Sequence, residues 1–126
     1  MPFIHIKSLP FNPSLDRSRI VEGIARDFSG KTGIELFHIH TTWEFFSPGC
    51  YAKGDKTPEY QPDARHPLIV DLLTPDFNDM DTIAVMLESI AESISERAVF
   101  PKNNIFINHR YAHQGMVFDD GKIVRW

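Results

Sequence analysis

Residues 67–73 read Pro-Leu-Ile-Val-Asp-Leu-Leu, a nearly continuous apolar run. A run of this length is typical of a strand that is buried on both faces. The pattern of an amphipathic helix follows, and either Asp79 or Asp81 can cap it. The inner positions of this helix recur at helical spacing and are apolar: Ile83, Met86, Leu87, Ile90 and Ile94. Because residues 104–111 read as another strand, this half of the chain is predicted to form a β-α-β unit.

The first half of the chain shows the same order of elements. Residues 2–9 predict a short strand, and Asn12-Pro13 indicates a helix start with the asparagine as cap. Apolar residues then recur at helical spacing until Gly30 ends the run, and residues 34–43 predict a second strand. Corresponding elements of the two halves are separated by similar offsets. We therefore interpret the chain as a duplicated β-α-β unit.

Two joined β-α-β units predict an α+β fold. Right-handed crossovers place both helices on one face of a single mixed sheet with four main strands. The turn signal Asp-Asp-Gly at residues 119–121 adds a C-terminal hairpin. We expect one domain over residues 1–126, whose halves, about 2–46 and 67–126, are joined by the long loop 47–66. Such a loop is often a lid or a contact arm, and an insertion without a role is the alternative.

The composition excludes several classes of protein. A chain of 126 residues is long enough for one domain with a real core. A net charge of −4 argues against a nucleic-acid partner, and the lone Cys50 excludes an internal disulfide. No apolar run approaches the roughly 18 residues that a membrane span needs, and the start lacks the features of a signal peptide. We therefore expect a cytoplasmic protein that acts without membrane, nucleic acid or cofactor.

One face of the predicted sheet carries more apolar side chains than a monomer usually leaves in water. Phe3, the strand at 34–43 and the strand at 67–73 all contribute to it. Large exposed apolar surfaces usually mark interfaces, so we predict a homo-oligomer whose sheets pack around a common centre. A homotrimer is favoured, because the hairpin after Tyr111 can extend the sheet of a neighbouring copy by edge pairing.

The first strand begins directly after the initiator methionine, in the stretch Met1-Pro2-Phe3. A methionine before a residue as small as proline is normally removed, which leaves the secondary amine of Pro2 at the amino terminus. An α-amino group titrates near roughly 7.7–8, and burial in an apolar pocket lowers the pKa of such a cation. A base with a pKa near neutrality suits proton abstraction next to a carbonyl group. If Met1 is retained, the nitrogen of Pro2 is an inert amide.

Three short motifs are similar to those of a known family. Gly30-Lys31 precedes the second strand, residues 105–111 read Ile-Phe-Ile-Asn-His-Arg-Tyr, and residues 115–121 belong to an aromatic, turn-rich tail. Together with a strand that opens on Pro2 and the duplicated plan, they resemble the tautomerase superfamily. The likeness is to the trimeric branch that includes macrophage migration inhibitory factor, and an uncharacterised bacterial branch shares the layout. It covers nearly the whole chain apart from the long loop.

The resemblance implies a tautomerase that moves a proton between the keto and enol forms of a small, acidic carbonyl compound. Pro2 is then the general base, and Lys31 matches a lysine that binds a carboxylate or enolate oxygen. Phe106 matches a tyrosine that reaches the pocket of a neighbouring subunit, so that a hydrogen-bond donor is missing here. Asn108 and Arg110 lie on the same strand face as Phe106, where Arg110 can supply a second cation. The alternatives are a solvated Lys31 at a helix end, Phe106 as plain core and Arg110 as a surface arginine.

Other functions are compatible with the sequence. In a sheet, several histidines can approach one another and ligate zinc or a similar metal: His5, His38, His40, His109 and His113. No carboxylate or cysteine lies at tight ligand spacing, so no metal site is assigned. A third possibility is a non-catalytic oligomeric module that binds a small ligand or another protein and retains Met1.

Overall fold

The computed structural model describes all residues from 1 to 126. In chain order, its strands and α-helices are β1 (Phe3–Ser8), α1 (Arg17–Thr32), β2 (His40–Phe45), β3 (Leu68–Pro75), α2 (Met80–Ala98), β4 (Ile105–Ala112), β5 (Val117–Asp119) and β6 (Lys122–Val124). The short 3₁₀ helices η1 (Leu36–His38) and η2 (Lys102–Asn104) precede β2 and β4, so each half contains such a turn at the same place. Neither α-helix combines the length and the apolar character that a membrane-spanning helix requires.

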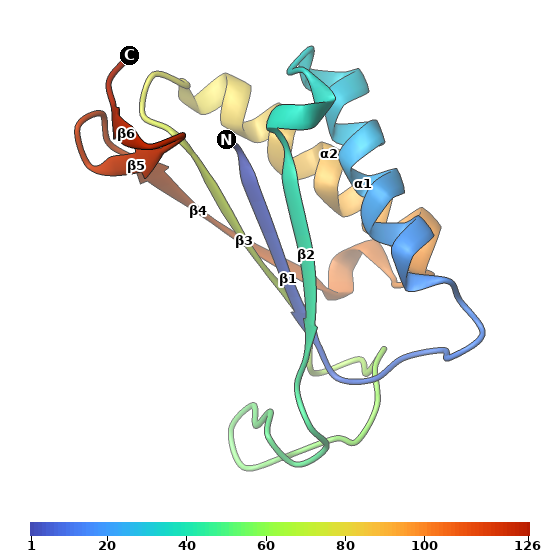
Figure 1. The fold of residues 1–126 in the computed structure, drawn as a ribbon. Coiled ribbons are helices and arrows are strands. Elements are labelled where there is room, and N and C mark those ends of the chain that lie inside the picture. The colour runs from blue at the N-terminus through green and yellow to red at the C-terminus, as the bar shows by residue number, and fades with distance from the viewer.

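The four main strands form one mixed sheet in the order β2-β1-β3-β4. β1 pairs in parallel with β2, and β3 pairs in parallel with β4, while β1 and β3 are antiparallel neighbours in the centre. Each half is therefore a β-α-β unit, and both helices cover the same face of the sheet (Figure 1). This arrangement confirms the predicted α+β fold with its duplicated units.

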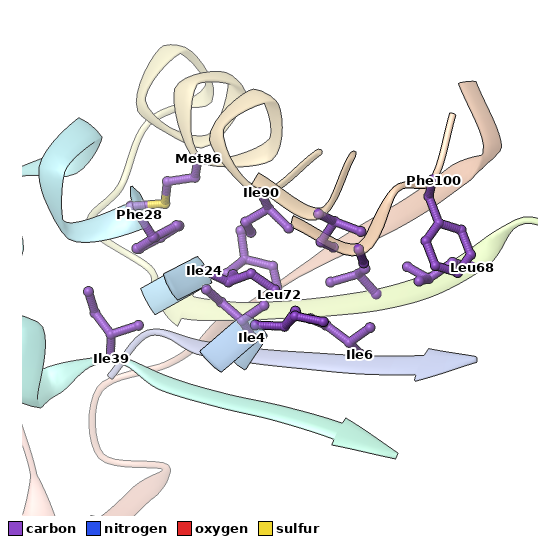
Figure 2. Close-up of a cluster of buried hydrophobic side chains, with 14 of the residues drawn as sticks. Ile4, Ile6, Ile24, Phe28, Ile39, Leu68, Leu72, Met86, Ile90 and Phe100 are labelled. Carbon is purple, nitrogen blue, oxygen red and sulfur yellow. The ribbon is translucent and has the colours of Figure 1, made fainter. Parts of the chain in front are cut away.

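The hydrophobic core lies between the helices and the sheet (Figure 2). Alternation along the central strands directs Ile4, Ile6 and Leu72 toward the helices, where they are completely buried. Phe28 of α1 and Ile90 of α2 meet them from the helical side. Burial of such side chains stabilises the fold by about 1.5–3 kcal/mol each. The start of β1 is therefore held on a rigid element.

Both ends of α1 differ from the prediction. Asp16 caps the helix in place of Asn12, because its side chain accepts a hydrogen bond from the backbone N–H of Arg19 at 3.3 Å. Asn12 instead closes a local turn by accepting from a backbone N–H two residues further on, a common competitor of helix capping. At the other end the helix passes through Gly30 and stops at Gly33, whose φ of 76° suits glycine.

Residues 34–39 do not belong to a strand, although the sequence pattern predicts one over 34–43. The chain instead forms η1, which the backbone hydrogen bond from His38 N to Glu35 O closes at 3.0 Å. β2 begins only at His40, which pairs with Phe3, the first residue of β1. Earlier residues have no neighbouring strand to pair with. Consequently His38 and His40 do not share a strand face.

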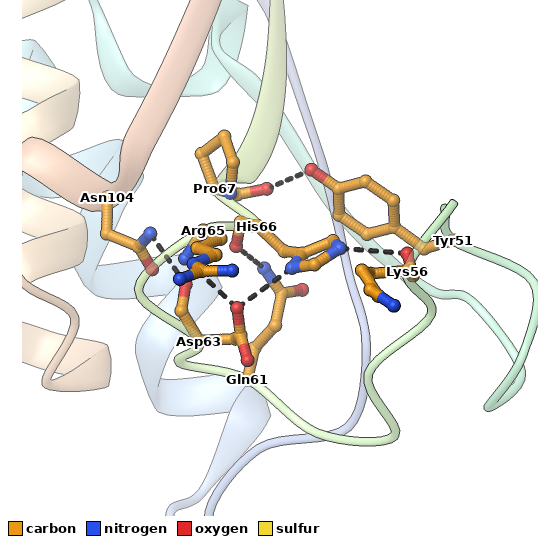
Figure 3. Close-up of polar contacts among 8 residues, drawn as sticks. All are labelled: Tyr51, Lys56, Gln61, Asp63, Arg65, His66, Pro67 and Asn104. Carbon is orange, nitrogen blue, oxygen red and sulfur yellow. Dashed lines mark hydrogen bonds and ion pairs between the residues drawn. The ribbon is translucent and has the colours of Figure 1, made fainter. Parts of the chain in front are cut away.

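The loop 47–66 has a defined conformation although it contains no helix and no named strand (Figure 3). The amide of Gln61 bridges two segments: its Nε2 donates to the carbonyl of His66 at 2.8 Å, and its Oε1 accepts from the backbone N–H of Leu9 at 2.6 Å. The His66 ring is held in turn by the carboxylate of Asp63 at 2.8 Å. The loop lies at the opposite end of the sheet from the N-terminus (Figure 1). It therefore does not cover the start of β1 in its own chain.

The predicted C-terminal hairpin is present as the antiparallel pair of β5 and β6. Asp120 and Gly121 join the strands with φ values of 49° and 77°. Positive φ at both central residues matches the right-handed twist of the flanking strands, which explains the Asp-Gly signal. The hairpin projects from the end of the sheet at which the N-terminus lies (Figure 1).

Candidate active site at the N-terminal proline

Pro2 is buried directly before β1. Like Ile4, it lies on the side of the sheet that faces the helices. A cavity of about 300 Å³ opens beside it, which is at the small end of the range for ligand sites. Its walls come from the N-terminus, from η1 and the residues before it, from the end of β3 and from α2: Met1, Pro2, Ile34, His38, Thr74, Pro75, Phe77, Asn78 and Met86. The cavity suits a small molecule.

Thr74 stands opposite Pro2 across the sheet. Phe3 pairs with Leu73 in the antiparallel register, so the next pair outward is Pro2 and Thr74. The hydroxyl oxygen of Thr74 lies 2.8 Å from Nε2 of His109 on β4. Burial lowers the pKa of His109, which keeps the ring neutral at pH 7. When the ring donates its Nε2–H to the threonine oxygen, the hydroxyl hydrogen can be donated either to the backbone carbonyl of Pro75, at 3.3 Å, or to a molecule in the cavity.

The residues after β3, which form one side of the cavity, are held in place by two aromatic side chains from the last part of the chain. The phenol of Tyr111 donates to the backbone carbonyl of Asn78 at 2.7 Å. Trp126 packs edge-on against Phe77, with 6.0 Å between the ring centroids, and its Nε1 donates to Asp76 at 2.7 Å. Tyr111 of β4 and the C-terminal Trp126 therefore hold the residues that form one side of the cavity.

The amino group of Met1 is partly desolvated beside the cavity. It donates to the backbone carbonyl of His38 at 2.7 Å. Burial lowers the pKa of this amine, and the negative charge of Asp119 raises it by a smaller amount. While Met1 is present, the nitrogen of Pro2 belongs to a peptide bond and has no basic lone pair. A free amine at this end of β1 experiences surroundings that favour its neutral, basic form.

Lys31 does not line this cavity. It is exposed in the last turn of α1, where it borders a polar groove between the two helices together with Ser89 and Glu92 of α2. A cation at this position interacts favourably with the C-terminal end of the helix dipole. Within one chain, the structure does not bring Lys31 and Pro2 into the same site.

The other three predicted site residues lie on the sheet face that no helix covers. Phe106, Asn108 and Arg110 alternate along β4 and are all exposed there, on the side of the sheet away from the cavity. The structure therefore groups them with one another and separates them from Pro2 of the same chain. The side chain of Phe106 is 55% exposed, so it is not plain core within one chain.

The histidines are distributed over different parts of the fold. His5 and His40 lie on the uncovered face, His109 faces the helices, His38 belongs to η1 and His113 follows β4. No group of three or more histidine, cysteine, aspartate or glutamate side chains is placed so that it can hold a metal ion.

Sequence patterns do not single out the polar residues nearest to Pro2. Thr74 and Asn78 follow an apolar strand, where threonine and asparagine commonly serve in turns. Their only signal is positional, because the end of β3 lies beside the start of β1 when these strands are antiparallel. That pairing is not visible in the local pattern. Met86 is predicted as a core residue of its helix, and the structure shows that it also lines the cavity.

Comparison with known proteins identifies the fold. No family model matches the chain, and no curated protein matches its sequence. Many solved structures are nevertheless similar to this chain, among them three that match along almost its whole length. A protein crystallised after inactivation by 2-oxo-3-pentynoate has a TM-score of 0.81 at 10% identity, with 97% of this chain and 94% of that chain covered. The two structures are therefore similar over nearly the full length of both chains.

The other two structures carry enzyme names. A fused 4-OT in an asymmetric trimer has a TM-score of 0.81 at 7% identity, covering 96% of this chain and 94% of that chain. Malonate semialdehyde decarboxylase has a TM-score of 0.72 at 6% identity, covering 96% and 93%. Identities this low establish a common fold and leave activity to be argued from the site.

Proposed function

We propose that this chain, which has the fold of the tautomerase superfamily, moves a proton between the keto and enol forms of a small carbonyl compound, with Pro2 as general base. One observation carries the proposal: Pro2 is buried directly before β1 and lines a cavity of about 300 Å³. An amine at this point is accessible to a small molecule and shielded from much of the solvent. The amine is itself the base, so the reaction needs no cofactor.

The reaction requires that Met1 be removed, so that Pro2 carries a secondary amine. Its nitrogen takes the proton from the carbon next to the carbonyl group, and the electrons of that bond form the carbon–carbon double bond. The carbonyl π electrons move to the oxygen, which then receives the same proton from the Pro2 cation. Burial lowers the pKa of the Met1 amine in the same surroundings, and it is expected to act likewise on Pro2.

Neutral hydrogen-bond donors are available for the oxygen that becomes negative. Thr74 and Asn78 line the cavity, and both also donate to the Pro75 carbonyl, at 3.3 and 3.0 Å. Asn78 keeps a second amide hydrogen, the Thr74 hydroxyl can rotate, and His109 lies behind Thr74 at 2.8 Å. Donors held ready for a developing charge lower the barrier, because they need no reorganisation during the reaction. In this scheme Thr74 contacts the substrate oxygen and His109 is a positioning residue.

We further propose that the protein acts as a cytoplasmic homotrimer. The uncovered sheet face with its exposed Phe106 supports assembly, and so does the trimer described for a fused 4-OT of the same fold. Because Phe106, Asn108 and Arg110 lie on that face, they reach a substrate only where a second copy presents them to the cavity.

A second candidate function is a non-catalytic binding module that uses the same cavity. The Met1 amine is hydrogen-bonded to the His38 carbonyl at 2.7 Å, and the nitrogen of Pro2 is then an amide. If Met1 is retained, the cavity can bind a small ligand but has no base. Whether the peptide bond between Met1 and Pro2 is cleaved therefore decides between the two functions.

The test measures the intact mass of the protein and the rate of enol–keto conversion. Intact mass of protein from its own host is expected to show loss of Met1. With phenylpyruvate and its methyl ester as probes, Pro2→Ala is expected to lower the rate of enol–keto conversion about 10²-fold or more. In the unmodified protein, kcat/KM is expected to rise with pH as Pro2 loses its proton, with a midpoint below about 7.7–8.0.

Pro10→Ala serves as the matched control, because Pro10 lies beyond the other end of β1, next to Leu9. It is expected to leave the rate of conversion unchanged. Complete retention of Met1, or equal rates for the protein and Pro2→Ala, would rule out proline catalysis and leave the binding module.

A further inference from the structure

Gly30 lies inside α1 at a position where the fold does not require a glycine. The helix continues to Thr32, so Gly30 does not end it, and its backbone is not in the left-handed region that favours glycine. Beyond its own part of the helix, a Cβ atom at this position would meet nothing within 4 Å. Only proline is less favourable than glycine in a helix interior. Neither helix stability nor close packing therefore explains this residue.

The missing side chain of Gly30 leaves room in a groove between the two helices. Asp27 of α1 accepts hydrogen bonds from Ser93 and Arg97 of α2, and the two helices run side by side in opposite directions (Figure 1). Gly30, about one turn further along α1, therefore lies opposite Ser89, about one turn earlier on α2. Both residues line a groove of about 500 Å³ whose walls contain no hydrophobic residue.

The hydroxyl of Ser89 has no hydrogen-bond partner in the protein, although this residue is only 4% exposed. A buried hydroxyl without a partner is unfavourable. One turn further along α2, the hydroxyl of Ser93 donates to the Asp27 carboxylate at 2.6 Å. Ser89 has no such acceptor, because the residue that faces it on α1 is Gly30. A polar atom that enters the groove at this point can supply the missing hydrogen bond.

The two walls of the groove carry opposite charges. Arg26 and Lys31 line it from α1, and Glu92 and Glu96 line it from α2. No ion pair joins either cation to either carboxylate, and Glu92 instead lies 3.6 Å from Lys102. Charges that face each other across a space too wide for direct contact can be bridged by a molecule that carries both signs. A cation and an anion on the same small molecule match this arrangement.

We propose that the groove between α1 and α2 binds a small zwitterion, namely an amino acid with a polar side chain. Its carboxylate lies against Arg26 and Lys31, its ammonium group lies against Glu92 and Glu96, and one of its polar atoms contacts Ser89. A cavity of about 150 Å³ is enough for benzene, so about 500 Å³ is ample for such a molecule. The groove shares no lining residue with the cavity beside Pro2, so the inference goes beyond the proposed function.

The experiment titrates the isotope-labelled full chain and follows its backbone amides by NMR. L-serine, L-asparagine and L-glutamine are the probes, because they are zwitterions with uncharged polar side chains. At least one of them is expected to cause saturable chemical-shift changes at Gly30, Lys31 and Ser89. Its N-acetyl derivative lacks the ammonium group, and its carboxamide lacks the carboxylate. Each derivative is expected to bind about 5-fold more weakly, since an exposed ion pair contributes up to about that factor.

Gly30→Leu places a side chain in the groove and is expected to abolish these shift changes. Its Cβ has room and leucine favours a helix, so the variant should unfold at the same or a higher urea concentration. Ser18→Leu is the matched control, because Ser18 is exposed on α1 and does not line the groove, and it should leave binding unchanged. Ser89→Ala is expected to weaken binding about 3- to 10-fold without lowering stability, because its hydroxyl has no partner to lose.

The inference is overturned if none of the three amino acids causes saturable shift changes. Equal binding of the two blocked derivatives, or unchanged binding in Gly30→Leu, would overturn it as well. The measurement does not involve Pro2 or enol–keto conversion. Its result is therefore independent of whether the proposed catalytic function is correct.

Discussion

Gly23 shows how one missing side chain permits a contact between the two helices. It is buried in the middle of α1, and a methyl group at this position would overlap the guanidinium of Arg97 on α2. That guanidinium is fixed, because its Nε and Nη2 donate to the Asp27 carboxylate at 2.8 and 3.0 Å. The hydroxyl of Ser93 donates to the same carboxylate at 2.6 Å. The four residues together join α1 to α2.

The cluster also makes stability depend on pH. The hydrogen bond from Arg97 holds the pKa of Asp27 below its usual value, and Ser93 adds to this effect. A depressed carboxyl pKa means that the unfolded chain binds the proton more tightly than the folded chain. The stabilisation is therefore complete above the usual carboxyl pKa, and it is lost as the pH falls through the lowered value.

Gly23→Ala is expected to lower the free energy of unfolding by about 1 kcal/mol. Displacing the guanidinium of Arg97 weakens charge-assisted hydrogen bonds worth roughly 1.5–3 kcal/mol. This loss is discounted because the side chains of Arg97 and Asp27 are 34% and 35% exposed. It is also offset by the better helix propensity of alanine, about 1 kcal/mol. Urea unfolding at neutral pH measures the difference.

The same substitution is expected to change sign in an Arg97→Ala background. Without the guanidinium, the three atoms nearest to the added methyl group are removed, and Gly23→Ala should raise the free energy of unfolding by up to about 1 kcal/mol. Equal destabilisation in both backgrounds would show that Arg97 is not the cause.

At the scale of elements, the loop 47–66 is held by side-chain hydrogen bonds and contains no named helix or strand, and the buried amide of Gln61 is one of these contacts. Gln61 is only 3% exposed, and it satisfies the N–H of Leu9 and the carbonyl of His66. It thereby ties the loop to the end of β1. Since the loop lies at the end of the sheet away from Pro2, its order and the chemistry at Pro2 are separable (Figure 1).

Gln61→Ala is expected to lower the free energy of unfolding by about 2 kcal/mol. Each buried group that it leaves without a partner costs about 1–3 kcal/mol, reduced where water enters the space. Hydrogen exchange should accelerate at the amide of Leu9 and within residues 56–66 before it does so elsewhere. Tyr60→Ala, at a neighbouring side chain that is 65% exposed, should change stability by less than about 0.5 kcal/mol. Unchanged exchange in Gln61→Ala would contradict the anchoring role.

At the scale of the whole molecule, the uncovered face of the sheet is mixed in character. Phe3 and Phe106 expose 37% and 55% of their surface. On the β1–β2 side of the same face, His5 is hydrogen-bonded to Thr42 and lies 3.3 Å from the carboxylate of Glu44. An interface here would combine apolar packing with polar rows, unlike a purely apolar core.

Phe106→Glu is expected to dissociate the proposed homotrimer, because it places a charge inside the interface. Sedimentation equilibrium should then show a 14.5 kDa species in place of one three times heavier. Val85→Glu is the matched control, since this side chain is 49% exposed on α2, in the layer on the other face of the sheet. A single 14.5 kDa species for the unmodified protein would refute the trimer.

The sequence alone determined the type and order of the main elements. The apolar run at 67–73 corresponds to β3, Asp79 caps α2 as one of two predicted caps, and the Asp-Gly signal at 119–121 forms its hairpin. These features depend on residues that are close together in the chain, so local patterns are sufficient to predict them. Pro2 was identifiable for the same reason, because its special chemistry follows from its position in the sequence.

Only the tertiary structure decided what surrounds Pro2. The antiparallel register of β1 and β3 brings Thr74 beside it, with His109 behind, whereas the orientation of α1 leaves Lys31 in a groove between the helices. Local periodicity reveals which side of an element is apolar, but not which elements meet or in what register. Those choices are made by packing between segments far apart in the chain, and the cavity is formed from such segments.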